Sequence, residues 1–176
     1  MSFEASLAIA VISVVLAQLL LNYLTFLRNA RDRFIEGVAN EQRLIEEISY
    51  TVRCKLSEIY FDGQRPTRTE LEIQLFQSLR GQSNLTMLEN ELRLWDINIK
   101  SWSHKVRDAR QNLLDVCLTA EPTSGEQGFD SSVLKVRCII GCLGNQSRSL
   151  IYAIYQRFSL SYKICLGRSE FSKPAK

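Results

Sequence analysis

Two cysteines in the last third of the chain have a spacing that suits metal coordination. Cys138 and Cys142 are four residues apart, so on a helix they would share one face and supply two thiolate ligands. A zinc site needs further ligands, but the chain has a single histidine, His104, and no C-x-x-C motif. We favour the alternative that the cysteines are small apolar core residues. The five are Cys54, Cys117, Cys138, Cys142 and Cys165.

Patterns that support catalysis are missing from the sequence. His104 lacks the Glu-x-x-His context of di-iron helical bundles, since residue 101 is a serine. No G-x-S-x-G, P-loop or G-x-G-x-x-G motif occurs. We therefore predict a protein that is not an enzyme, with no catalytic residues, cofactor or small-molecule substrate. A metal-binding bundle or enzyme is the less favoured alternative.

Cations gather toward the C-terminus. Between Asp130 and Glu170 there is no acidic residue, and we define a basic face by the cations there, which alternate with aromatic residues. Its members are Lys135, Arg137, Arg148, Arg157, Lys163 and Arg168. We favour internal pairing with acidic residues of the 84–120 segment. The alternatives are an acidic protein partner, nucleic acid, and anionic lipid.

The elements that must position these residues begin with an apolar segment. Residues 6–27 carry no charge, and as a helix they would span roughly 33 Å, close to the hydrocarbon thickness of a bilayer. A cleaved signal peptide would have a basic start and a shorter apolar stretch, whereas Glu4 is the only charge before this one. A buried helix of a soluble protein is seldom apolar on all sides over such a length. We predict one transmembrane helix within residues 1–27.

Flanking charge predicts the orientation. No Lys or Arg precedes the apolar segment, whereas Arg28, Arg31, Arg33 and Arg43 follow it. The positive-inside rule then places residues 28–176 in the cytoplasm and the short N-terminus outside. The lipid bilayer is thus the first predicted partner of this single-pass membrane protein.

The apolar segment carries two stripes that would suit contact with another membrane helix. Small residues form the first stripe and polar residues the second. Their members are Ser6, Ala10, Ser13 and Ala17 in the first, and Gln18, Asn22 and Thr25 in the second. The alternative is that the polar residues simply lie at the membrane interface. The stripes predict self-association or a membrane protein partner.

The rest of the chain has the pattern of an all-α protein. We expect helices at about 28–61, 68–80, 84–120 and 130–165, the first continuing directly from the membrane helix. Apolar residues recur at helical spacing in the first, and Thr67 with Glu70 resembles a capping box for the second. The third has an unbroken heptad-like pattern from Leu85 to Val116. Gly141 and Gly144 leave open whether the last helix is continuous, and a strand over 150–164 is the alternative there.

These elements predict an antiparallel cytoplasmic bundle, over residues 28–166, of three long helices and one short one. If the 84–120 helix returns to the bilayer, the 120–130 loop lies near the membrane. The basic C-terminus then lies roughly 50 Å away, and residues 167–176 form a flexible basic tail. The sequence favours an interaction, scaffold or accessory-subunit module that binds proteins or a second copy of itself. A membrane-tethered binder of nucleic acid or an acidic partner is the alternative.

Overall fold

The computed structural model describes residues 3–76, 83–121 and 125–159, which are helical apart from short connections and contain no strand. The helices are α1 (Phe3–Phe61), α2 (Arg68–Phe76), α3 (Leu85–Leu94), α4 (Lys100–Leu118) and α5 (Gly125–Phe158). The all-α prediction is therefore confirmed for the described part of the chain, and the alternative of a strand is wrong for residues 150–158.

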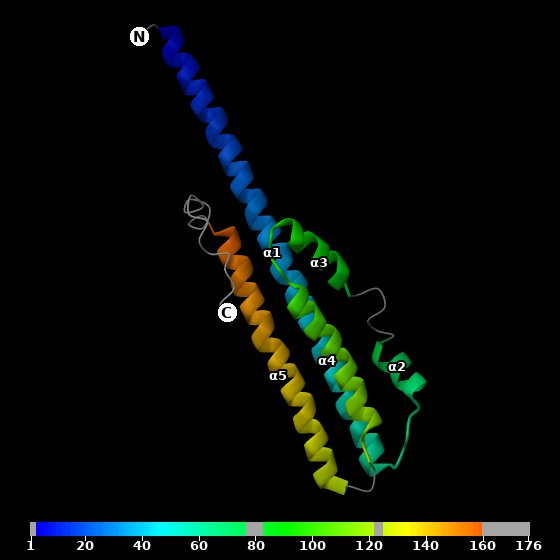
Figure 1. Cartoon of the computed structure of the whole chain (residues 1–176). Coiled ribbons are helices and arrows are strands. Elements are labelled where there is room, and N and C mark those ends of the chain that lie inside the picture. Colours follow the sequence, from blue (N-terminus) through cyan, green and yellow to red (C-terminus); the bar gives the residue numbers. More distant parts are fainter. Residues whose placement is uncertain (1–2, 77–82, 122–124, 160–176) are drawn as a thin grey trace.

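The apolar segment and the helix that follows it form one uninterrupted element. α1 has 59 residues and is about 90 Å long at 1.5 Å per residue. It contains no proline, and Gly37 lies at a close contact with α3. A Cβ atom at Gly37 would lie 3.1 Å from a methyl carbon of Leu88. The helix projects its N-terminal third beyond all other elements (Figure 1).

A single apolar core lies between α1, α4 and α5, which run side by side (Figure 1). α1 contributes a one-sided stripe that begins at Leu27, and α5 contributes residues from Val136 to Phe158. The apolar residues that recur at helical spacing after the membrane segment thus lie in the core, as expected for amphipathic helices. The fully or almost fully buried side chains of α1 include Phe34, Val38, Ile45, Val52, Leu56 and Ile59.

The predicted long helix over 84–120 is interrupted, which is a correction to its heptad interpretation. α3 ends at Leu94 and α4 starts at Lys100, with a turn between them. Asp96 has a φ of 58°, and the Asn98 side chain accepts a hydrogen bond from the Lys100 backbone N–H. Asp and Asn tolerate such turn conformations because their side chains bond to nearby backbone groups. Both helices bury their share of the heptad residues, so the periodicity identified the buried residues but not the break.

This break reverses the predicted direction of the later helices. Arg110 of α4 contacts Glu41 and Cys117 contacts Val52, so α4 runs parallel to α1. α5 then returns, with Phe129 beside Phe61 and Phe158 beside Phe34. The end of α4 therefore lies far from the apolar segment, and the end of α5 lies next to that segment. The sequence predicted the opposite, because it took α3 and α4 as one helix.

The other predicted helix boundaries agree with the structure or differ from it by a few residues. The capping box is confirmed, since Thr67 Oγ1 accepts from Glu70 N at 3.3 Å and Glu70 Oε2 accepts from Thr67 N at 2.8 Å. α5 begins at Gly125, earlier than predicted, and is continuous through Gly141 and Gly144. The predicted ends of the short and last helices, and the tail over 167–176, fall outside the described residues.

Candidate functional site

The apolar segment of α1 exposes its described side chains on all sides from Leu7 to Tyr23. It is the one helix in the described part of the chain that is long and apolar enough to cross a membrane, with a window of mean hydropathy 2.1 that is not buried at all. The core helix of a soluble protein would be covered by its neighbours, which this window is not. Its large exposed residues include Leu7, Val11, Val14, Leu16, Leu19, Leu20 and Phe26.

Within this segment the polar groups bond to their own helix. Ser13 Oγ donates to the Ile9 carbonyl at 2.8 Å and Thr25 Oγ1 to the Leu21 carbonyl at 2.9 Å. Gln18 Nε2 donates to Asn22 Oδ1 at 3.2 Å. Hydroxyl bonds to the i−4 carbonyl make these groups tolerable in lipid. Ala10 and Ala17 are exposed, Ser6 has no described side chain, and the predicted contact with another membrane helix stays a prediction.

Packing begins at the last residue of the apolar segment, where four aromatic rings meet. The Trp95 ring lies 6.1 Å from Phe26, 6.5 Å from Phe34 and 4.7 Å from Phe158, measured between centroids. Leu27 beside them is buried. These contacts join α1, the α3–α4 turn and the end of α5, so no flexible linker separates the apolar segment from the core.

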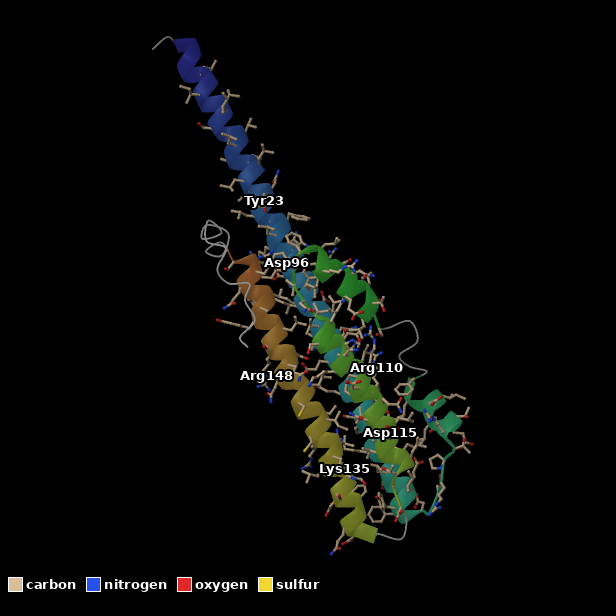
Figure 2. All side chains as sticks on the ribbon, viewed as in Figure 1. Tyr23, Asp96, Arg110, Asp115, Lys135 and Arg148 are labelled. Carbon is tan, nitrogen blue, oxygen red and sulfur yellow. The ribbon has the colours of Figure 1, made fainter. Side chains whose placement is uncertain are left out.

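Of the described members of the predicted basic face, one pairs with an acidic residue of the 84–120 segment and three do not. Lys135, Arg137 and Arg148 of α5 are exposed. Figure 2 labels Lys135 near the start of α5 and Arg148 further along it, and at 3.6 residues per turn these two side chains lie about 140° apart around the helix. Among the described residues, Arg157 is the member with an acidic partner, Asp96 at 3.5 Å. Lys163 and Arg168 lie outside the described residues. The acids of α3 pair elsewhere, Glu91 with Arg33 and Glu89 with Arg107, because the break after Leu94 turns α3 away from α5.

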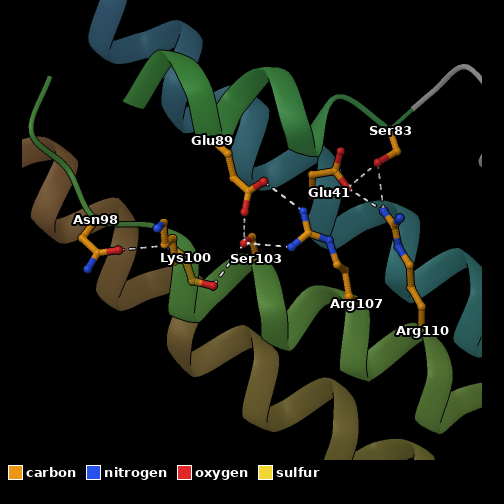
Figure 3. Close-up of polar contacts among 8 residues, drawn as sticks. All are labelled: Glu41, Ser83, Glu89, Asn98, Lys100, Ser103, Arg107 and Arg110. Carbon is orange, nitrogen blue, oxygen red and sulfur yellow. Dashed lines mark hydrogen bonds and ion pairs between the residues drawn. The ribbon is translucent and has the colours of Figure 1, made fainter. Parts of the chain in front are cut away.

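A buried ion pair fixes α3 to the core, and the sequence reasoning missed it. Glu41 of α1 is 1% exposed and accepts hydrogen bonds from Arg110 Nη2 at 2.7 Å and from Ser83 Oγ at 3.2 Å (Figure 3). It also accepts one from the backbone N–H of Asn84 at 2.8 Å. Burial lowers the pKa of Arg110, against the opposing effect of Glu41. An acidic residue at helical spacing between Val38 and Ile45 was the available signal, since it lies on the buried stripe.

A second polar cluster joins α3 to α4. Ser103 donates to Glu89, and Arg107 Nη2 donates to the other Glu89 oxygen at 2.9 Å (Figure 3). The hydrogen bond from Ser103, with help from Arg107, lowers the pKa of Glu89. In both clusters the carboxylate is satisfied by hydrogen-bond donors, so its role is to hold helices together. His104 next to Ser103 is exposed.

The cysteines do not assemble a metal site in the described part of the chain. Cys138 and Cys142 are both exposed on α5, and no group of three or more potential ligands lies together among the described residues. The expectation of core cysteines is therefore wrong for Cys54, Cys138 and Cys142, which are exposed, and right for Cys117, which is buried. Burial raises the pKa of Cys117 to about 12, and Cys165 lies outside the described residues.

Comparison of the chain with models of known protein families, with curated proteins and with solved structures gave no match.

Proposed function

We propose that the chain is a single-pass membrane protein whose helical bundle lies outside the bilayer and serves as an interaction module. The observation that carries this proposal is the uncovered apolar segment of α1, which continues without a linker into a packed core. Apolar side chains exposed around a whole helix are stable in lipid and unfavourable in water. The arginines that follow the segment favour a cytoplasmic bundle with the N-terminus outside.

The membrane part of this proposal is tested by substituting the segment in the full chain. Leu16→Arg with Leu19→Arg would place two charges near the centre of the apolar segment, and we expect the protein to move from the membrane fraction to the alkaline-extractable or aggregated fraction. Leu134→Arg on α5, which is also exposed, is the matched control and should leave the membrane fraction unchanged. Equal membrane retention of all three chains would overturn the membrane anchor.

The interaction part rests on surfaces that the core leaves uncovered. The two stripes of the apolar segment and the outer side of α5 remain available to a second copy or another protein. The carboxylates of Glu41, which is buried, and Glu89, which is half-buried, bond to donors within the fold and hold helices together. The mass of the full chain in detergent tests self-association, and cross-linking in membranes tests other partners. A strict monomer without cross-linked partners would overturn this part.

An acidic partner is a second candidate, which the free cations of α5 favour. Lys135, Arg137 and Arg148 are exposed and have no ion pair with any described residue, so they could bind acidic protein or nucleic acid phosphates. Retention of an acidic peptide or of DNA by the detergent-solubilised chain should fall with salt and with Arg148→Ala. Lys105→Ala on the exposed surface of α4 is the control, and equal loss in both variants would reject the basic face as the binding surface.

A further inference from the structure

The turn between α3 and α4 presents the most exposed large apolar side chain in the described part of the chain. Leu94 is 84% exposed, although it lies at the end of a helix whose other leucines, Leu85, Leu88 and Leu92, are buried. A single exposed leucine is ordinary on a soluble surface. Leu94 differs from such a residue because its neighbour Trp95 contacts the apolar segment, so Leu94 lies close to the proposed membrane surface.

The contacts of Trp95 fix the position of this turn along the axis of α1. Its ring lies 6.1 Å from that of Phe26, which is 57% exposed and belongs to the uncharged segment. Leu27 is already buried by the core, so the fold has no spacer that would hold the turn away from a bilayer. In Figure 1 the upper end of α3 and the end of α5 both lie where α1 leaves the packed core. A membrane that contains Phe26 must therefore meet the turn.

The charges around the turn suit the surface of a membrane. Arg28 and Arg93 are exposed, and Arg31 lies over the Tyr155 ring at 5.1 Å. Arg157 donates to the Trp95 carbonyl at 3.0 Å and lies 3.5 Å from Asp96, so the acid in the turn is offset. Cations beside amphipathic aromatic rings are typical of the headgroup region. Asp32 pairs with Arg28 at 3.9 Å and with Arg31 at 2.7 Å, and Asp96 pairs with Arg157. The four arginines therefore exceed these two aspartates, and Arg93 has no ion pair with any described residue.

We propose that the α3–α4 turn is a second contact with the bilayer, with Leu94 and the edge of Trp95 in the headgroup region and the nearby arginines on anionic lipid phosphates. This inference rests on the proposed membrane anchor. It changes the role of the bundle, because a domain held flush against lipid at two points has a fixed tilt. Movement of α1 in the membrane then passes directly to α5 through the ring contacts of Trp95 and Phe158.

Fluorescence quenching of Trp95 by labelled lipid tests the proposal. The chain has two tryptophans, so Trp102→Phe leaves Trp95 as the single emitter. The full chain is reconstituted in vesicles of phosphatidylcholine and phosphatidylglycerol that carry a spin label near the headgroup or near the end of the acyl chain. We expect the shallow label to quench Trp95 more strongly than the deep one. If Trp102→Phe does not fold, the difference in quenching between the unmodified chain and Trp95→Phe gives the same quantity.

Two substitutions on α3 distinguish insertion of Leu94 into the lipid from mere closeness of Trp95 to the membrane helix. Leu94→Asp removes the apolar contact and should reduce the quenching of Trp95 by the shallow label. Met87→Asp, at a residue that is 55% exposed on the same helix, should leave the quenching unchanged. Equal effects of the two variants, or no quenching of Trp95 by either label, would overturn the second contact.

A tryptophan placed in the apolar segment distinguishes this failure from failure of the anchor. In Leu16→Trp with Trp95→Phe and Trp102→Phe, we expect strong quenching by the deep label. Quenching of this variant without quenching of Trp95 leaves the anchor intact and rejects the turn. Absence of quenching in both rejects the anchor as well as the turn.

Discussion

Glu41 is a carboxylate that the core excludes from water and that two other elements satisfy. Its substitution by glutamine would leave Arg110 without its charge partner, and breaking a buried pair by removing one member typically costs about 3 kcal/mol or more. We expect Glu41→Gln to lower the free energy of unfolding by roughly this amount, measured by chemical denaturation in detergent. Glu46→Gln, at an exposed residue of the same helix, should have little effect.

Replacement of both partners provides the complementary test. In Glu41→Met with Arg110→Met no charge remains buried, so much of the lost stability should return. If the double variant is as unstable as Glu41→Gln, the hydrogen bonds of Glu41 to Ser83 and Asn84 matter more than its charge.

Glu89 should make stability depend on pH at the acid end. Its pKa is lowered from 4.5 in the folded chain, so it contributes stability above the unfolded-state pKa and loses it as the pH falls through the folded-state pKa. Glu89→Gln should therefore have a lower Tm than the unmodified chain at neutral pH, and the gap should close as the pH falls below 4.5. Glu126→Gln, exposed at the start of α5, is the control. A gap that is the same at every pH would contradict this role.

The cysteines should differ in reactivity, because the thiolate is the nucleophile. Cys117 is buried and its pKa is raised to about 12, so it should resist maleimide at neutral pH until the chain unfolds. Cys54, Cys138 and Cys142 are exposed and should react. Mass spectrometry of a Cys165→Ser chain counts the labels. Labelling of Cys117 in the folded chain at the rate of the others would contradict the described core.

At the scale of elements, the break between α3 and α4 depends on a residue in a left-handed conformation. Glycine adopts a positive φ without the steric cost that an L-residue with a Cβ pays, about 1–2 kcal/mol. We expect Asp96→Gly to be at least as stable as the unmodified chain and Asp96→Ala to be less stable by about 1 kcal/mol. Unfolding in denaturant measures both.

At Asp108, which lies within a helix, the glycine variant should be the less stable of the two, the reverse of the order expected at Asp96. Asp108 is exposed within α4, where glycine costs about 1 kcal/mol relative to alanine, so Asp108→Gly should be less stable than Asp108→Ala. If Asp96 behaves in the same way as Asp108, residues 84–120 form the single helix that the heptad pattern predicted.

At the scale of the whole molecule, the topology can be tested through the direction in which α5 runs along α1. Arg31 lies over Tyr155, so Arg31→Cys with Tyr155→Cys should cross-link with a short bismaleimide in a chain whose Cys54, Cys138, Cys142 and Cys165 are serine. Arg31→Cys with Phe129→Cys should not, because Phe129 contacts Phe61 at the far end of α1. Gel mobility and mass measure the product. Cross-linking of the second pair alone would restore the topology expected from the sequence.

The amphipathic pattern by itself determined that the chain is helical and which apolar side chains of α1, α3 and α4 face the core, apart from the interruption at residues 95–99. Helical spacing indicates burial on one face whatever that face contacts, so the apolar faces of α1, α4 and α5 could be predicted. The capping box of Thr67 could be predicted because it depends on local sequence alone. The apolar segment was equally clear, because composition alone makes residues 6–27 unusual.

Only the tertiary structure decided where the helices turn and which charges meet. An interruption of five residues between Leu94 and Lys100 preserves the heptad spacing, since both helices face the same core, so periodicity could not reveal it. The reversal at Asp96 brings the end of α5 to the apolar segment and separates the acids of α3 from the basic face. Glu41, Arg110 and Ser83 meet because packing joins residues distant in sequence, which local spacing does not encode.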